Sequence, residues 1–169
     1  MLTIRPERAE DHVAIHQIHT LAFGQSNEAD LVDALRHQTA LSISLVAVQD
    51  NQLVGHIAFS PVTITSETET IEALGLAPMA VLPVYQRTGI GSQLVKAGLQ
   101  ACRKTKYGIV VVLGHPAYYP RFGFTPSQPH GIVWEHDVLE DVFMVKELKE
   151  GALAQTSGVV KYHAAFERV

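Results

Sequence analysis

The feature that most constrains the fold lies at residues 79–95, which read MAVLPVYQRTGIGSQLV. An apolar run predicts a strand, the strand leads into a loop that contains Gly89 and Gly91, and the loop leads directly into a helix. Free backbone N–H groups and the positive end of the helix dipole make a helix N-terminus an anion site. The two glycines leave room for a phosphate close to the backbone, and Arg87 adds a positive charge. The segment therefore predicts a phosphate-bearing ligand.

Two common phosphate-binding motifs do not fit this loop. The dinucleotide fingerprint requires a third glycine, and Leu94 occupies its position. The Walker loop requires Gly-Lys-Ser/Thr, whereas Gly91 is followed by Ser92 and Gln93. The pattern that remains is Q-x-x-G-x-G, which begins at Gln86. A tight strand-to-helix turn that needs glycine only for packing is the alternative.

Composition places the chain among single-domain globular proteins. It has 169 residues, of which 47% are apolar and 18% are charged, and these values exclude a disordered chain. The 13 Lys and Arg against 17 Asp and Glu give a net charge of −4 without a basic block, which argues against nucleic acid and anionic membranes as partners. The single Cys102 cannot form an internal disulfide, and we expect neither a signal peptide nor a membrane span. We therefore expect a soluble, cytoplasmic protein.

Local patterns predict a mixed α/β fold. Helical spacing predicts a helix from Ala9 to Phe23, a second helix capped by Ser26 or Asn27, and a third helix after the glycine loop. Extended patterns predict strands at residues 2–5, 43–49, 53–65, 71–82, 109–113, 131–134 and 142–148. The apolar run IVVVL at 109–113 is typical of a strand buried on both faces, and Pro78 predicts an edge, a bulge or a splayed end in its strand.

Three histidines recur at i, i+4 and i+7 on one face of the first predicted helix: His12, His16 and His19. Such spacing suits metal ligands. The face lies roughly opposite Ala14, Ile18 and Leu21, so we favour exposure to solvent and expect no metal site. Cys102 falls on the apolar stripe of the third helix and is expected to be buried core, not a nucleophile.

A second motif follows the glycine loop, in which Tyr119 precedes Gly123-Phe124 by three intervening residues. Together, Q-x-x-G-x-G and Y-x-x-x-G-F resemble the acyl-CoA loop and the segment after the fifth strand of the GCN5-related N-acetyltransferase (GNAT) superfamily. The resemblance covers about residues 2–149, and the wording LGHPAYYPRFGF at 113–124 with GAL at 151–153 is similar to the YhbS-type group of predicted acetyltransferases.

The resemblance implies the GNAT fold of class α/β (α+β mixed). This fold has a central, mostly antiparallel sheet of about six to seven strands with splayed fourth and fifth strands, flanked by about four helices. The GNAT domain is then expected at residues 1–150 and a C-terminal tail, packed on the same domain, at residues 151–169.

The resemblance also implies acetyl-CoA as co-substrate, bound where the fourth and fifth strands splay apart. Main-chain groups at 79–81 are then expected to hydrogen-bond the pantetheine arm as an added strand would, and one N–H to polarise the thioester carbonyl. The residues assigned to the cofactor are Met79, Ala80, Val81, Gln86, Arg87, Thr88, Gly89, Ile90, Gly91, Ser92, His115 and Tyr118. His115 departs from the family pattern, in which many relatives have Asn nearby, and a capping or packing role fits it equally well.

Tyr119 is the candidate general acid. Attack by an amine on the thioester expels a thiolate whose thiol has a pKa of about 8.5, and a phenol with a pKa of about 10 can protonate it. The alternative is a structural tyrosine packed beside Phe122 and Phe124, and Tyr118 competes for the same role.

The general base and the acceptor stay open at this stage. Candidates for the base are Glu28, Glu72 and His56, or a chain of water molecules. In the resembled fold, the acceptor surface would include Phe23, Gln25, Glu28 and Trp134. Glu28 suits a cationic amine, while a small molecule, a peptide N-terminus and a lysine side chain remain possible acceptors.

The function expected from these residues is transfer of the acetyl group from acetyl-CoA to a primary amine, by direct attack in a ternary complex. A non-catalytic acyl-CoA-binding module of the same fold is the alternative, and a nucleotide-binding domain is a weaker one. The expected partners are acetyl-CoA and an amine acceptor, and monomer and homodimer both stay open.

Overall fold

The computed structural model describes residues 1–139 and 141–168. It divides into two compact units. Unit 1 contains Met1–Ser60, Ala77–Ala101 and Ala164–Val169, and unit 2 contains Pro61–Leu76 and Cys102–His163. Two long strands, β3 (Gln52–Thr65) and β4 (Thr70–Val81), contribute residues to both units. Among the described residues, no helix is long and apolar enough to cross a membrane.

The expected mixed α/β class with a mostly antiparallel sheet is confirmed. The strands pair in the order β1-β2-β3-β4-β5-β8-β6, and β9 pairs with β3 and β7. The described residues form nine strands in place of six to seven, because β6, β7 and β9 are short, and three α-helices in place of four. Single turns of 3-10 helix occur at Ala9–Asp11, Pro83–Tyr85, Tyr119–Phe122, Gln128–His130, Leu153–Gln155 and Ala164–Arg168.

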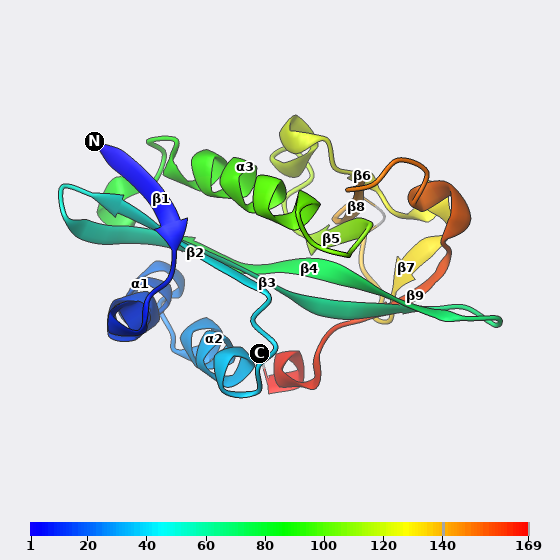
Figure 1. Cartoon of the computed structure of the whole chain (residues 1–169), viewed down its shortest axis with the longest axis horizontal. Helices are drawn as coiled ribbons and strands as arrows, with labels where there is room; N and C mark the ends of the chain where they lie inside the picture. Colours follow the sequence, from blue (N-terminus) through cyan, green and yellow to red (C-terminus); the bar gives the residue numbers. More distant parts are fainter. Residues whose placement is uncertain (140, 169) are drawn as a thin grey trace. The chain divides into compact units, whose positions relative to one another are not determined.

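Unit 1 is a sheet with helices on both faces. Strands β1 (Leu2–Pro6) and β2 (Ile43–Gln49) are antiparallel, as are β2 and β3. Helices α1 (His12–Phe23) and α2 (Asn27–His37) cover one face, and α3 (Ile90–Arg103) covers the other (Figure 1). Alternate residues of β3 therefore have different neighbours: Gly55 lies against Leu94 of α3, whereas His56 meets His19 of α1.

Helix α1 corrects part of the predicted apolar face. Ile15, Ile18 and His19 are its buried residues, whereas Leu21 is 61% exposed. The expectation that the three histidines face solvent is wrong for His19, which is 0% exposed. The buried face of α1 is therefore rotated relative to the predicted apolar face. It includes His19 because the His19 ring has a buried hydrogen-bond partner, His56.

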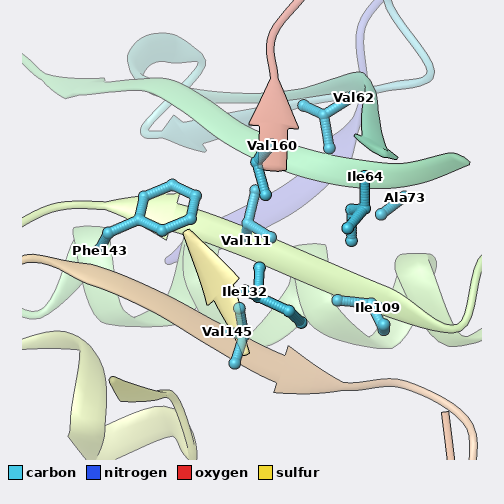
Figure 2. Close-up of a cluster of buried hydrophobic side chains, with 9 residues drawn as sticks. All are labelled: Val62, Ile64, Ala73, Ile109, Val111, Ile132, Phe143, Val145 and Val160. Carbon is cyan, nitrogen blue, oxygen red and sulfur yellow. The ribbon is translucent and has the colours of Figure 1, made fainter. Parts of the chain in front are cut away.

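Unit 2 combines parallel and antiparallel pairs. Strand β4 runs parallel to β5 (Ile109–Leu113), and β5 runs antiparallel to β8 (Phe143–Glu147), which also pairs with β6 (Thr125–Pro126). A cluster of buried side chains fills this unit (Figure 2): Val62, Ile64, Ala73, Ile109, Val111, Ile132, Phe143, Val145 and Val160. The all-apolar run IVVVL is thus buried in mid-sheet at four of its five residues, as its composition predicts.

The predicted tail contains a strand that its weak periodicity did not indicate. Strand β9 (Gly158–Lys161) pairs antiparallel with β3 and parallel with β7 (Ile132–Trp134). Only Val160 of this strand is fully buried, so the short pattern offers little signal. The last residue of the predicted tail, 169, lies outside the described residues.

The two registered pairs of β4 with β5, Leu74 with Val110 and Gly75 with Val111, both lie in unit 2. The next part of β4 (residues 77–81) belongs to unit 1, and the predicted divergence of the two strands there stays a prediction.

Candidate active site

The side chains on either side of Arg87 hydrogen-bond the glycine loop to the residues that precede it, one of them at the end of β4. Gln86 Nε2 donates to the Val81 carbonyl over 2.9 Å, and Thr88 Oγ1 donates to the Tyr85 carbonyl over 2.5 Å. Arg87 and Gly89 both have positive φ, at 64° and 90°. The backbone thus makes a sharp left-handed turn, for which Gly89 is the residue without a steric cost.

The loop faces open space at Gly89. A Cβ added there would meet no atom within 4 Å, and Arg87 and Thr88 beside it are exposed. The next residue, Ile90, is buried and begins α3, and the carbonyl of Gly89 accepts the first α-type hydrogen bond of that helix from Gln93 over 3.1 Å. The first turn of α3 therefore points its N-terminal N–H groups towards this open loop.

The main-chain groups of β4 alternate in direction. Leu82 N donates to the Val54 carbonyl of β3 over 2.8 Å, so the N–H groups of Leu82 and Ala80 point towards β3. Those of Met79 and Val81 point to the opposite edge. Ala80 is buried and the other two are half-buried. Of the three predicted pantetheine contacts, the backbone of Met79 and Val81 is thus oriented to pair with an added chain, and that of Ala80 is not.

Tyr119 begins a 3-10 turn that closes at Gly123, which has φ 94°. Its half-buried ring packs edge-on against Phe124 at 5.8 Å and Tyr118 at 5.1 Å, measured between ring centroids. Burial raises the pKa of the Tyr119 hydroxyl to about 12. The phenol is therefore protonated throughout the physiological range.

Tyr118 and His115 have structural partners on the same turn. Arg121 lies over the Tyr118 ring, 5.1 Å from its centroid, and Phe122 packs against that ring at 5.2 Å. His115 Nδ1 accepts a hydrogen bond from Ala117 N over 3.2 Å, within the turn that precedes Tyr119. Whether either residue also contacts a cofactor stays a prediction.

The residues predicted for the acceptor belong to both units. Phe23 is 43% exposed at the end of α1, where its ring stacks on His19 at 6.0 Å between centroids, and Gln25 Nε2 donates to Glu28 over 3.1 Å. In unit 2, Trp134 lines a pocket of about 240 Å³ together with Val133 and Leu139. Trp134 Nε1 is buried and has no hydrogen-bond partner among the described residues.

The three histidines of α1 bind three different partners and do not converge. His12 contacts Glu7 over 3.1 Å, His16 contacts Asp33 over 2.8 Å, and His19 contacts His56 over 2.8 Å. His16, Asp30 and Asp33 offer ligand atoms within 4.8 Å of one another, but the two carboxylates are exposed and Asp33 is already paired with Arg36.

Sequence reasoning missed a polar network in unit 1, apart from His56; its two histidines are buried and its other two members are half-buried. It runs from His19 and His56 to Ser44 and Glu7. Its only sequence signal is the pair of histidines, one in an apolar strand and one on a helix that packs on that strand.

Fold and loop together define a small α/β protein with an open, anion-binding geometry at the N-terminus of α3. The model of the acetyltransferase (GNAT) domain family matches residues 3–127. The chain therefore belongs to the GNAT acetyltransferase family, as its two motifs predict.

Relatives similar to the chain over nearly its whole length support the same family. The uncharacterized N-acetyltransferase YhbS of Escherichia coli strain K12 is 37% identical over 168 residues, which cover 99% of each chain. The crystal structure of YhbS from E. coli in complex with CoA has a TM-score of 0.92 and covers 99% of this chain and 92% of that one. A GNAT family acetyltransferase from Brucella melitensis, solved in complex with acetyl-CoA, is 37% identical with a TM-score of 0.81 and covers 98% of both chains.

Proposed function

We propose that the protein transfers the acetyl group of acetyl-CoA to a primary amine, by direct attack of the amine on the thioester in a ternary complex. The observation that carries this proposal is the open turn at Gly89, which presents the N-terminus of α3 next to the oriented backbone of β4. Family membership and the CoA and acetyl-CoA complexes of two relatives support the same ligand.

The pyrophosphate of acetyl-CoA is proposed to bind the loop from Gln86 to Ser92. Backbone N–H groups at the start of α3 donate to its oxygens, and Arg87 contributes a charge-assisted hydrogen bond. Gln86 acts indirectly, because its amide holds the loop to the Val81 carbonyl.

The pantetheine arm is proposed to pair with Met79 and Val81 as a short added strand. These two residues point their main-chain groups away from β3, and an N–H of one of them then polarises the thioester carbonyl. Ala80 contributes packing, because its side chain is buried.

Tyr119 is proposed to stabilise the departing thiolate. Its pKa of about 12 lies above the value of about 8.5 for the thiol, so complete proton transfer is uphill by about 5 kcal/mol. The hydroxyl acts best as a hydrogen-bond donor to the thiolate as its charge develops, and the thiolate then takes its proton from solvent.

The acceptor is proposed to be a cationic amine that loses a proton before attack. Glu28 and Phe23 on the α1–α2 side supply a carboxylate and an exposed ring for such a group. A single carboxylate suits a small amine, a lysine side chain and a peptide N-terminus alike.

Two measurements test the function. Titration calorimetry with acetyl-CoA is expected to show binding, and a free-thiol assay with a panel of primary amines is expected to show CoA release that depends on the amine. Binding without amine-dependent release from any acceptor would support a non-catalytic acyl-CoA module instead. No binding of acetyl-CoA would remove both functions.

A further inference from the structure

Four side chains of unit 1 form a continuous chain of hydrogen bonds. His19 Nε2 lies 2.8 Å from His56 Nδ1, and His56 Nε2 lies 2.7 Å from Ser44 Oγ. Ser44 Oγ in turn donates to Glu7 Oε1. His19 and His56 are both 0% exposed, so the first link is shielded from water.

The charge of Glu7 fixes the direction of every hydrogen bond in this chain. Burial raises the pKa of Glu7, but hydrogen bonds from Arg36 and Ser44 outweigh it and leave the pKa lowered, so Glu7 is a carboxylate that only accepts. Ser44 must then donate to Glu7 and accept from His56 Nε2–H. The His56 ring is therefore neutral with an unprotonated Nδ1, and that nitrogen accepts from His19 Nε2–H.

This polarity leaves an unprotonated Nδ1 on His19 at the inner end. Nδ1 is buried and has no hydrogen-bond partner among the described residues. Burial lowers the pKa of His19 to about 4 and that of His56 well below its usual value, which keeps both rings neutral at pH 7. His16 lowers and Asp33 raises the pKa of His19 by smaller amounts, and Arg36 lowers that of His56.

The outer end of the chain reaches the surface. Arg36 Nε donates to Glu7 Oε2 over 2.8 Å and Arg36 Nη2 donates to Glu7 Oε1 over 2.9 Å. His12 Nε2 lies 3.1 Å from Glu7 Oε2. The Glu7 side chain is 16% exposed and that of His12 is 39% exposed. A proton that reaches Glu7 neutralises a charge, whereas a proton held on His19 or His56 would leave a charge in the interior.

The inner end lies on β3 and α1, and β3 is hydrogen-bonded to the chain directly after the residues proposed to hold the thioester. Leu82 N, one residue beyond Val81, donates to the carbonyl of Val54, which lies two residues from His56 on β3. The His56 ring contacts His19 of α1 and therefore lies on the face of the sheet that α1 covers. The ring of Phe23 stacks on the His19 ring at 6.0 Å between centroids and is itself 43% exposed.

We propose that the chain His19–His56–Ser44–Glu7 is a proton relay in which His19 Nδ1 is the general base for the acceptor amine. This inference rests on the proposed acetyl transfer and requires Phe23 to turn aside when the acceptor binds. The amine nitrogen forms the C–N bond and the C–S bond breaks. The amine proton moves to His19 Nδ1, while the Nε2 protons of His19 and His56 and the Ser44 hydroxyl proton each move one link, so that Glu7 is neutralised.

The relay explains how His19, whose pKa is lowered by burial, removes a proton from the acceptor amine. An imidazolium on His19 is disfavoured by burial, but a concerted shift never places a full charge there. When water replaces the product, the shift runs in reverse and the network regains its starting tautomers. Of the three candidate bases named from sequence, His56 is thus one link from the base and acts as a positioning residue for His19.

The test replaces Ser44 with alanine, which cuts the relay and leaves both histidines in place. We expect Ser44→Ala to lower kcat for acetyl transfer by about 10²-fold with little change in KM for acetyl-CoA. Ser60→Ala is the control, because Ser60 is a 0% exposed serine of unit 1 that has no hydrogen-bond partner among the described side chains, whereas Ser44 is half-buried and hydrogen-bonded. A Ser44→Ala enzyme with the kcat of the wild type would overturn the relay and leave the acetyltransferase function intact.

Nitrogen-15 NMR of the histidine rings gives a readout that does not depend on activity. At pH 7, both His19 and His56 are expected to be neutral Nε2–H tautomers in the wild type, and the His56 tautomer is expected to become mixed in Ser44→Ala. A His19 ring protonated at Nδ1 would overturn the proposal. A wild-type protein with the expected tautomers that transfers acetyl to no amine would instead overturn the proposed function, and the relay with it.

Discussion

The ring of Tyr119 lies directly against the α-carbon of Gly114, in space that any Cβ at residue 114 would fill. The nearest ring atom, Cε2, is closer to that position than real side chains tolerate, and Cδ2 is 2.8 Å from it. Gly114 follows β5 immediately, so the end of a buried strand sets the position of the phenol. This contact makes Tyr119 a rigidly placed side chain, which a hydrogen-bond donor to a developing charge requires.

Tyr119→Phe is expected to lower kcat by about 10²-fold, because it removes only the hydroxyl that stabilises the thiolate. Binding of acetyl-CoA should change little, since the hydrogen bond strengthens mainly in the transition state. The defect should shrink with acyl donors whose thiols are more acidic. Steady-state kinetics with two such donors measure it, and an unchanged kcat would shift the role to Tyr118 or to water.

Gly114→Ala is the contrasting variant, because it alters the position of the Tyr119 ring and keeps the hydroxyl. The added methyl group must displace the Tyr119 ring, so both kcat and the free energy of unfolding should fall. Tyr119→Phe should leave the free energy of unfolding within about 1 kcal/mol of the wild type, because the ring still packs against Phe124. Equal loss of stability in both variants would mean that the hydroxyl has a structural role.

Gly89→Ala is expected to weaken acetyl-CoA binding about tenfold or more, which corresponds to about 1.4 kcal/mol, because the methyl group projects into the open space of the loop. A residue with a Cβ at φ 90° also costs about 1–2 kcal/mol of stability. Gly151→Ala controls for this cost, since Gly151 has φ 84° and equally open space. Calorimetric titration of both variants should show weak binding only in Gly89→Ala, and equal affinities would remove the pyrophosphate from this loop.

Cys102 is expected to react slowly with a thiol reagent in the native protein and rapidly in denaturant. The side chain is 0% exposed, and burial raises the pKa of its thiol to about 12, so almost no thiolate exists at pH 7 to 8. Cys102 is the single cysteine of the chain, so the absorbance of the group that the reagent releases measures the reaction of this one thiol. Fast labelling without denaturant would show that α3 opens readily or that its buried face is assigned incorrectly.

The Arg5–Asp11 pair is expected to make stability depend on pH in the acid range. Arg5 Nη1 lies 2.7 Å from Asp11 Oδ2, Asp11 is 4% exposed, and the hydrogen bond from Arg5 lowers the pKa of Asp11. Because the folded pKa is lowered, the stabilisation is complete above the unfolded value of about 3.9 and is lost as pH falls through the folded pKa. Denaturant titrations from pH 7 to pH 2 should show this loss.

Asp11→Asn tests the origin of that pH dependence. It should reduce the free energy of unfolding at pH 7 by about 1–3 kcal/mol and flatten its decline below pH 4. Asp50→Asn serves as the control, because its carboxylate is 81% exposed and pairs only with the N-terminal amine at 3.4 Å, an arrangement worth about 0–1 kcal/mol. If the free energy of unfolding of Asp11→Asn fell as steeply below pH 4 as that of the wild type, the pH dependence would come from other carboxylates.

The sequence by itself determined the elements whose signals are local. Strand β2 was predicted at its observed bounds, Ile43–Gln49, because the apolar, β-branched run ISLVAVQ is followed directly by the turn residues Asp50 and Asn51. The loop before α3 was predicted because Gly89 supplies a backbone conformation that other residues adopt at a cost. The two motifs also identified the family, since their residue types and spacing are specific to it.

Only the tertiary structure decided which polar groups meet. Helical spacing places His12, His16 and His19 on one face of α1, but it does not state what packs against that face, and each of the three has a different partner. His19 and His56 are 37 residues apart in the chain and Ser44 and Glu7 are also 37 apart, so no local pattern relates them. The tautomers of His19 and His56 depend on the negative charge of Glu7, and hydrogen bonds from Arg36 stabilise that charge. A hydrogen-bond network of this kind is set by the packing of α1 and α2 on the sheet, because its energy comes from contacts that form only when these elements come together.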